Sequence, residues 1–386
     1  MSAFLDEIRA KVDGGTPLSF DEGVRLMKER DVGALGALAN RVRERLHGDR
    51  TYFNRNLHIN ATNVCVASCM FCSFARLKPG DKGAYTMSHD EAWGKLRARV
   101  DAGDPLTEVH IVNGLHDGLP FDYYEELLRG LKRIKPSIHL KAFTAVELFF
   151  FHKHFGLPLR TILERLRAAG MDSLPGGGAE IFAPKVRKKI CDDKCTGDEW
   201  LDVHRTAHRM GLRSNCTMLY GTIETIEERV DHMLQLRALQ DETGGFQTFI
   251  PLAFHPDNNA LMKLPAPTGT EDLRTYAVAR LMLHNIPHIK AYWIMLGVKT
   301  AQTALWFGAD DLDGTVQEER IYHMAGAETP QVMSPAEIIR IIRNAGRTPV
   351  ERDTLYNVVA EGAALVSDKP YRRDVRRDNL KLEVVS

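Results

Sequence analysis

Short segments rich in β-branched and other apolar residues alternate with longer amphipathic segments, and this alternation constrains the fold more than any other feature. In the longer segments, apolar residues recur every three or four positions, which is the helical period. Eight strands are predicted, at residues 57–61, 108–113, 138–144, 176–181, 212–219, 246–252, 288–295 and 310–314. Eight strands that alternate with helices are typical of an α/β protein with a (β/α)8 barrel of the TIM type.

The predicted barrel leaves a segment on each side of it. The first 50 residues contain amphipathic segments that we expect to form helices outside the barrel. The last 40 or so residues end in a charged run, SDKPYRRDVRRDN. We therefore expect an N-terminal helical extension at residues 1–50, the barrel at 51–345, and a C-terminal extension with a charged tail at 346–386.

The composition argues against several classes of partner. Lys plus Arg equals Asp plus Glu at 51 residues each, so no net charge attracts the chain to nucleic acid or to an anionic membrane. The most apolar short run, residues 146–155, contains His and Lys and is well short of the ~20 residues of a membrane span. The first 15 residues lack the apolar stretch of a signal peptide. We expect a cytoplasmic protein that binds neither nucleic acid nor membrane.

Three cysteines, Cys65, Cys69 and Cys72, have the spacing C-x3-C-x2-C directly after the first predicted strand. Three thiolates this close can surround one metal centre and leave one metal position open. Active sites of barrels lie at the C-terminal ends of the strands, where this loop is expected. Structural zinc would need a fourth ligand. His58 is the nearest candidate upstream, but it is better explained as a strand residue. A disulfide framework does not fit six cysteines in 386 residues.

The run LPGGGAEIF, at residues 174–182, places three glycines before Glu180 on the fourth predicted strand. Glycines allow a ligand to approach the backbone closely, and a carboxylate there can accept hydrogen bonds from the vicinal hydroxyls of a ribose. The alternative is a flexible loop before a strand.

Further polar residues follow later predicted strands. His255, Asn258 and Asn259 come just after the sixth strand, where they could contact substrate carboxylates and hydroxyls, although Pro-Asp-Asn-Asn is also an ordinary turn sequence. Thr315 follows the eighth strand and could bind an anion through free amide donors, or serve as a helix N-cap.

A second pair of cysteines, Cys191 and Cys195, could indicate an auxiliary cluster. Only Cys216 remains to join them, whereas a second cluster requires about four thiolates. We interpret these three as ordinary free cysteines.

With an aromatic residue, Phe71, before its last cysteine, the motif resembles that of the radical S-adenosylmethionine (SAM) enzymes. The resemblance implies a 4Fe–4S cluster on the three cysteines, with SAM chelating the open iron. It places Phe71 near the adenine. Asn113 and Gly114 stand where the family usually has a Gly-Gly-Glu turn that holds the methionyl amino group.

Segments such as KAFTAVE, LPGGGAEIF, FIPLAFHPDNN and LDGTVQEERIYHMAGA, together covering residues 50 to 330, resemble the menaquinone-pathway radical enzymes and their deazaflavin-synthase relatives. The pattern is most similar to the aminofutalosine synthases. It implies that an adenosyl radical adds to 3-[(1-carboxyvinyl)oxy]benzoate (enolpyruvyl benzoate), with release of methionine and bicarbonate, and that an electron donor such as flavodoxin or ferredoxin supports the reaction. The expected contacts to the substrate carboxylates are Thr144, His255, Asn258, Asn259 and Thr315.

Two alternatives remain open at the level of sequence. One is a sibling radical SAM enzyme, either the cyclase that acts on dehypoxanthine futalosine or a deazaflavin synthase. The other is a non-catalytic iron–sulfur or zinc protein that uses the barrel as a binding scaffold, because the fold alone does not establish an activity.

Overall fold

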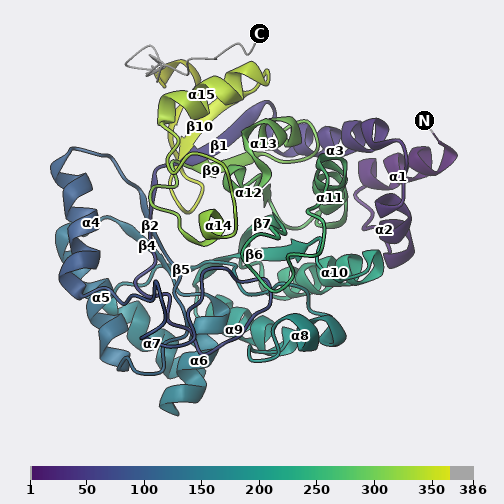
Figure 1. The fold of residues 1–386 in the computed structure, drawn as a ribbon. Coiled ribbons are helices and arrows are strands. Elements are labelled where there is room, and N and C mark those ends of the chain that lie inside the picture. Colours follow the sequence, from purple (N-terminus) through teal and green to yellow (C-terminus); the bar gives the residue numbers. More distant parts are fainter. Residues whose placement is uncertain (1, 366–386) are drawn as a thin grey trace, which may run out of the picture.

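The computed structural model describes residues 2–365, and its centre is a parallel β-sheet rolled into a barrel (Figure 1). Strands β2 to β8 form one parallel sheet in the order of the sequence. The barrel strands are β2 (Asn56–Ile59), β3 (Glu108–Ile111), β4 (His139–Ala142), β5 (Ser173–Leu174), β6 (Arg213–Tyr220), β7 (Phe246–Ala253), β8 (His288–Ile289) and β9 (Asp311–Gly314).

Strand β9 closes the barrel between β8 and β2. On the β8 side, the amide of Asp310 donates to the Ile289 carbonyl (3.0 Å) and the amide of Ala291 donates to the Asp311 carbonyl (2.7 Å). On the other side, the amide of His58 donates to the carbonyl of Gln317, just beyond β9, at 2.9 Å. Eight parallel strands therefore complete the ring, and the predicted (β/α)8 barrel is confirmed.

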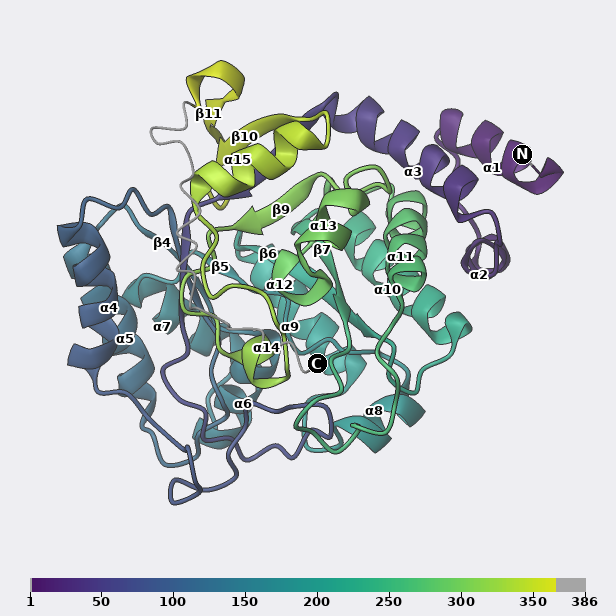
Figure 2. The ribbon, with the colours of Figure 1, turned by 45° about the horizontal axis from the view of Figure 1, so that its top comes forward.

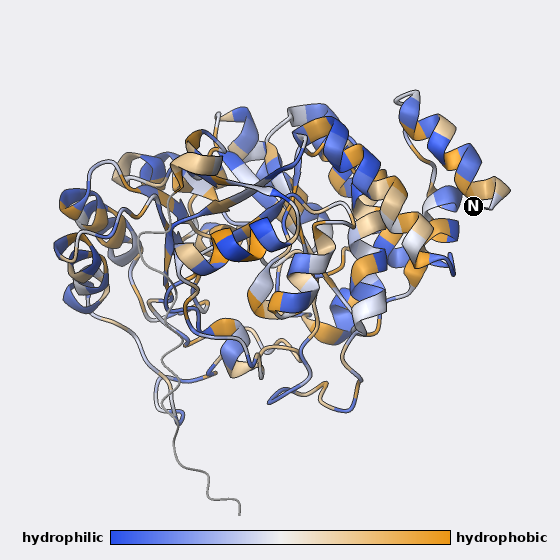
Figure 3. Cartoon of the chain, turned by 90° about the horizontal axis from the view of Figure 1, so that it is seen from above, coloured by the Kyte–Doolittle hydropathy of each residue, from blue (hydrophilic) through white to orange (hydrophobic). Residues whose placement is uncertain are grey.

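Helices surround this ring in the positions expected between successive strands. In Figure 3 they carry both hydrophilic and hydrophobic residues, as expected for helices with one face against the barrel. The helices are α4 (His89–Asp101), α5 (Phe121–Ile134), α6 (Ala145–Phe155), α7 (Leu159–Ala169), α8 (Pro184–Ile190), α9 (Gly197–Arg209), α10 (Ile226–Thr243), α11 (Gly269–Met282), α12 (Trp293–Leu296), α13 (Val298–Ala304), α14 (Ile321–Met324) and α15 (Pro335–Asn344). No helix of the described residues is long and apolar enough to cross a membrane.

The first 50 residues form the expected helices, α1 (Ala3–Asp13), α2 (Phe20–Met27) and α3 (Val32–His47). Figure 2 shows them at one side of the barrel, with α3 near α11. Each has a side-chain N-cap: Ser2, Ser19 and Asp31 accept a hydrogen bond from the first turn.

A second, smaller sheet lies at the N-terminal end of the barrel. It has the order β11-β10-β1-β9, with β1 (Arg50–Asn54), β10 (Thr348–Arg352) and β11 (Val358–Glu361), followed by a 3-10 turn at Gly362–Ala364. Strand β10 pairs with β1 in parallel, so the segment after residue 346 packs on the barrel. The charged tail predicted after it lies outside the described residues.

Two strand predictions were wrong. Residues 176–181 form a loop, and the strand at this place is the two-residue β5. Gly176 lies so close to β6 that an added Cβ would be 2.8 Å from the backbone of Cys216, and Gly178 has a φ of 86°, outside the β region. Residues 288–295 begin as β8, but the chain turns after Ile289 and enters α12.

Candidate functional site

A cavity of about 260 Å³ occupies the barrel at the C-terminal ends of the strands. One end, which we call the thiol end, is lined by Cys65, Cys69 and Cys72 with Phe71. The opposite end, which we call the floor, lies among the strands themselves. It is lined by His58 of β2, His110 of β3, Lys290 after β8 and Asp313 of β9. Apolar side chains form much of the wall between the two ends, including Val112, Val146, Ile250 and Leu252.

Neighbouring loops hold the cysteine loop by backbone hydrogen bonds. The amide of Cys65 donates to the carbonyl of Arg76 at 2.8 Å, and the amide of Met70 donates to the carbonyl of Ile190 at 2.9 Å. Gly114 lies directly against this loop, because an added Cβ would be 2.2 Å from the carbonyl oxygen of Val64. The positions of the three thiols therefore depend on contacts made in the folded protein.

The three thiols fit a metal centre better than they fit a disulfide or an inert packing role. All three are free and line the same cavity. Burial raises the pKa of Cys65 and Cys69, so as thiols they would stay protonated, whereas ligation by a metal requires and stabilises thiolates. The proposed fourth zinc ligand, His58, lies in β2, and its ring stacks on His110 with centroids 4.6 Å apart. The donor set is therefore three thiols at one end of a cavity.

Glu180 lies beside the thiol end, in the loop after β5, with a φ of 46°. Its carboxylate accepts a hydrogen bond from Lys194, and both side chains are only 8% exposed. Burial is the largest influence and would lower the pKa of Lys194, but Glu180 together with Cys69 and Cys191 outweighs it, and the pKa is raised. The Lys194 ammonium also lies 5.5 Å from the centre of the Phe71 ring. A buried ion pair thus faces the place where the three thiols and the aromatic ring meet.

Glu147 connects the ends of β3 and β4. One carboxylate oxygen accepts from the amide of Asn113 (3.0 Å), and the other accepts from the amide and the hydroxyl of Thr144 (2.8 and 2.7 Å). The Asn113 side chain in turn accepts from the amide of Ala61, just before the cysteine loop. Burial raises the pKa of Glu147 to about 7, although these donors oppose the shift. Glu147 therefore positions Asn113 and Thr144 at the cavity wall.

At the floor, the two histidines differ in their polar neighbours. A carboxylate oxygen of Glu108 lies 3.6 Å from His110 Nδ1, which is within ion-pair distance. Among the described residues, His58 makes no side-chain hydrogen bond, and its Nε2 is fully buried. Burial, and next the neighbouring His110, lower the pKa of His58 to about 3, so this imidazole is neutral in the structure. Lys290 donates to Asp313 at 2.8 Å.

The structure divides the residues predicted from the sequence into two groups. Those that line the cavity are Cys65, Cys69, Cys72, Phe71, Asn113, Gly114, Thr144 and Glu180. Those that do not line it are His255, Asn258, Asn259 and Thr315. For the second group, contact with substrate stays a prediction.

The side chains of the second group are hydrogen-bonded to backbone carbonyls elsewhere in the protein. His255 Nε2 lies 2.8 Å from the carbonyl of Met295, and the amide of Asn258 donates to the carbonyl of Met324. Asn259 caps its own turn by donating to the carbonyl of His255. Thr315 donates to the carbonyl of Asn56 in β2. Each of these contacts stabilises a loop or the barrel closure.

Sequence reasoning did not find Lys194, Glu147, His110 or Lys290. A signal existed for Glu147, because Thr144 and Glu147 have the spacing of a capping box at the start of α6. No comparable signal existed for the others, since their role depends on which strand faces lie together.

The remaining cysteines are buried away from the cavity lining. Cys216 lies in β6 and donates weakly to the carbonyl of Thr248. Cys191 lies within a short segment, residues 190–194, that supports the cysteine loop, and Cys195 directly follows it. Within it, Asp193 accepts from both the amide and the hydroxyl of Ser68.

Two regions of the chain match known families. Residues 59–236 match the radical SAM superfamily, and residues 243–364 match the CofH/MqnC C-terminal region. The aminodeoxyfutalosine synthase of Thermus thermophilus is 50% identical, over 92% of this chain and 96% of that protein. The enzyme of the same name from Streptomyces coelicolor is 48% identical, over 92% and 94%. The 5-amino-6-(D-ribitylamino)uracil–L-tyrosine 4-hydroxyphenyl transferase of Methanopyrus kandleri is 41% identical, over 90% and 94%.

Solved structures of lower sequence identity share the fold. Methylornithine synthase (PylB) superposes with a TM-score of 0.71 at 17% identity, over 89% of this chain and 97% of that one. HydG, a maturase of the FeFe-hydrogenase, also has a TM-score of 0.71, at 16% identity and over 91% and 76%.

Proposed function

Because the chain belongs to the radical SAM superfamily, we propose that it joins the 5′-deoxyadenosyl group of SAM to enolpyruvyl benzoate and so forms aminodeoxyfutalosine, a step of menaquinone biosynthesis. SAM is consumed as a substrate, and methionine and bicarbonate are released. The observation that carries this proposal is the 50% and 48% identity to two aminodeoxyfutalosine synthases over 92% of the chain. The cavity supports it, since the three thiols lie at one end of a space with largely apolar walls.

Cys65, Cys69 and Cys72 would hold a 4Fe–4S cluster through three of its irons, which leaves the fourth iron for SAM. Held by these three residues, such a cluster would supply one electron for the reductive cleavage of SAM to methionine and the adenosyl group that adds to the alkene. The donor set supports this assignment, because the loop offers three thiols to one cavity.

The residues around the thiol end would bind the rest of SAM. The Glu180 carboxylate would accept hydrogen bonds from the ribose hydroxyls, and Phe71 would contact the adenine. The three glycines at 176–178 leave room for the nucleoside because they carry no side chains. Asn113 and Gly114 would contact the methionyl amino group of SAM. The Lys194 ammonium, which also pairs with Glu180, would contact the methionyl carboxylate.

The walls of the cavity would control the reaction of the alkene. Val112, Val146, Ile250 and Leu252 present apolar surface between the thiol end and the floor. Such walls exclude water and hold the substrate in one orientation, with its alkene next to the adenosyl carbon. Thr144 remains a candidate contact to the substrate, because its hydroxyl is positioned by Glu147 at 2.7 Å.

The product identifies the reaction. Protein reconstituted without oxygen is incubated with SAM, a reductant and enolpyruvyl benzoate, and the products are analysed by mass spectrometry. We expect one product that carries the adenosine group and has lost a carboxylate. Formation of free 5′-deoxyadenosine with no adenosine-bearing product would contradict the proposal and favour hydrogen abstraction, as in the cyclase that acts on dehypoxanthine futalosine.

A second candidate function follows from the 41% identity to the hydroxyphenyl transferase of Methanopyrus kandleri. The same reconstituted protein is offered tyrosine and 5-amino-6-(D-ribitylamino)uracil in place of enolpyruvyl benzoate. Turnover of this pair alone would assign the chain to the transferase group.

Analysis of metal and inorganic sulfide distinguishes both enzymes from a non-catalytic zinc protein, because an iron–sulfur cluster contains sulfide and a zinc site does not. The electron donor, a flavodoxin or a ferredoxin, and the cytoplasmic location stay predictions.

A further inference from the structure

The floor of the cavity concentrates basic groups that the functions assigned above do not use. His58 and His110 are register partners on β2 and β3, and their rings stack at an interplanar angle of 13°. The ammonium of Lys290 lines the same floor. These three groups come from strands on both sides of the barrel closure, so only the folded ring brings them together.

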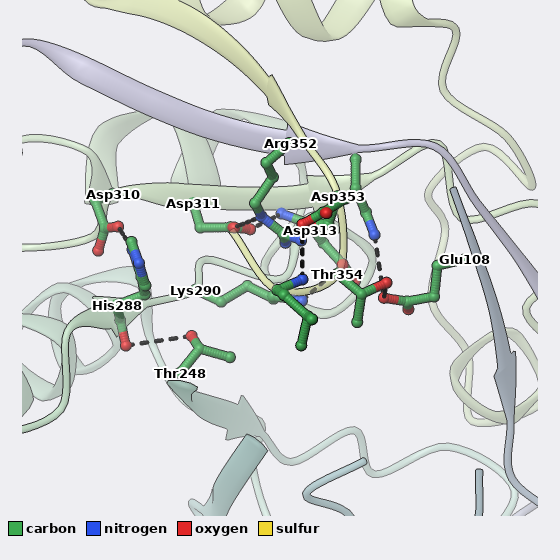
Figure 4. Close-up of polar contacts among 12 residues, drawn as sticks. Glu108, Thr248, His288, Lys290, Asp310, Asp311, Asp313, Arg352, Asp353 and Thr354 are labelled. Atoms are coloured by element: carbon green, nitrogen blue, oxygen red, sulfur yellow. Dashed lines mark hydrogen bonds and ion pairs between the residues drawn. The ribbon is translucent and has the colours of Figure 1, made fainter. Parts of the chain in front are cut away.

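The carboxylates near this floor are already neutralised. Asp313 pairs with Lys290 at 2.8 Å, as Figure 4 shows. Glu108 pairs with Lys141 at 2.8 Å and accepts from Thr354 at 2.8 Å. His110 also has Glu108 as an acidic neighbour, 3.6 Å from its Nδ1, whereas the His58 side chain makes no hydrogen bond among the described residues. His58 is 8% exposed, and its Nε2 is buried with no hydrogen-bond partner among the described residues. An imidazole that makes no hydrogen bond within the protein is free to bind an acceptor in the cavity that it lines.

The direction of the cavity determines which part of the proposed substrate meets the floor. The adenosyl carbon arises at the thiol end, so the alkene of the substrate must face that end. The benzoate ring then extends down between the apolar walls. Its carboxylate, on the ring carbon meta to the enol ether, points toward the strands.

We propose that His58 and His110, with Lys290, form the site that binds the ring carboxylate of the substrate. This inference rests on the proposed function. An N–H group of each imidazole donates to the carboxylate oxygens, and the Lys290 ammonium, which also pairs with Asp313, has further N–H groups to donate to them. The site selects an aromatic acid over a neutral ring of the same shape, because hydrogen bonds to a charged acceptor are about twice as strong as those to a neutral one.

The test compares the substrate with its ring carboxamide, which has the same shape and no ring charge. Binding is measured by anaerobic calorimetry on the reconstituted protein with S-adenosylhomocysteine present and no reductant, so that no turnover occurs. We expect the wild type to bind the acid about tenfold to 100-fold more tightly than the carboxamide. In His58→Phe and His110→Phe, which keep a stacked ring but lose the donors, this ratio falls toward one.

The matched control is His154→Phe, at an exposed position of α6 that does not line the cavity. It keeps the wild-type ratio. Iron content and the thermal midpoint show whether each variant is folded, and Leu, which also lacks a donor, replaces His at the same two positions if a Phe variant is not.

An unchanged ratio in folded variants of both floor histidines overturns the site, while product formation by the wild type would leave the proposed function intact. If the wild type neither binds nor converts the acid, the proposed function fails, and this inference fails with it.

Discussion

At the scale of single residues, the ionisation of the thiols determines what the cysteine loop can bind. Burial raises the pKa of Cys65 and Cys69, and a buried thiolate without a cation is unfavourable. The proposed cluster would supply that cation, and it would then require all three ligands. Cys191, Cys195 and Cys216 do not line this cavity, and we do not expect them to bind the metal centre.

We therefore expect Cys69→Ala to lose most of the iron and sulfide that the wild type binds, while the barrel remains folded. Cys69 is only partly buried, so its removal leaves little empty space. The measurement is iron and sulfide per protein after anaerobic reconstitution. Cys216→Ala, in β6, is the control and keeps the wild-type content. Equal iron in both variants would contradict the assignment of the cluster.

Glu147 is a second residue with a prediction at this scale. Its pKa is raised from 4.5 to about 7 in the folded protein, with burial as the main cause. The folded state therefore binds a proton more tightly than the unfolded state between these values. Stability contributed through this group is present at low pH and is lost as pH rises from about 4.5 to 7, by up to about 3 kcal/mol.

Glu147→Gln removes this titration. We expect the difference in unfolding free energy between pH 5 and pH 8 to be smaller in the variant than in the wild type. Denaturant unfolding at both pH values measures it. A variant with the same pH dependence as the wild type would show that Glu147 does not titrate in this range. Glu164→Gln, on the exposed face of α7, keeps the wild-type dependence.

At the scale of elements, the segment at residues 190–194 supports the cysteine loop from the side of α8. Its backbone accepts from Met70, its Asp193 accepts twice from Ser68, and its Lys194 pairs with Glu180. One short segment therefore links the cluster loop to the proposed ribose site. We expect substitutions of its side chains to change the rate at which the protein loses the cluster.

Asp193→Ala should accelerate loss of the cluster several-fold, because two hydrogen bonds to a carboxylate are removed from the loop. The measurement is the rate at which cluster absorbance decays in the presence of an iron chelator without oxygen. Asp192→Ala, at the adjacent exposed residue, decays at the wild-type rate. Equal rates in the two variants would exclude a supporting role for Asp193.

At the scale of the whole molecule, the N-terminal end of the barrel is closed by the chain that follows α15. Arg352 in β10 pairs with Asp311 in β9 at 2.6 Å, and Thr354 donates to Glu108 at the start of β3 (Figure 4). Both partners in the ion pair are nearly fully buried. Residues from the far end of the described chain thus bind two carboxylates beneath the floor of the cavity, Asp311 through an ion pair and Glu108 through a hydrogen bond.

Removal of one partner of a buried pair is costly, because the other charge remains unpaired. Arg352→Met should lower the unfolding free energy by about 3–5 kcal/mol. Thermal or denaturant unfolding measures the loss. Arg340→Met, on the exposed face of α15, is the control and changes stability little. A small effect at Arg352 would mean that water reaches Asp311.

Part of the fold was predictable because it is encoded in local periodicity. The alternation of strands and helices predicted the closed barrel, and the spacing of Cys65, Cys69 and Cys72 predicted three thiols at the C-terminal end of β2. The failures have a common cause. Residues 176–181 were predicted as a strand, but the approach of Gly176 to β6 and the positive φ of Gly178 depend on neighbours far away in the chain.

The sequence by itself determined the class of fold, the three thiols and the likeness to radical SAM enzymes, because these depend on spacing within short segments. Only the tertiary structure decided which polar groups share the cavity. Lys194 meets Glu180, and His58 meets His110, because parallel strands and the loops after them converge around one axis. His255, Asn258, Asn259 and Thr315 follow strands as closely in the sequence, yet their side chains bond to protein groups outside the cavity lining. Position after a strand is a local property, whereas the direction of a side chain depends on the packing of the whole barrel.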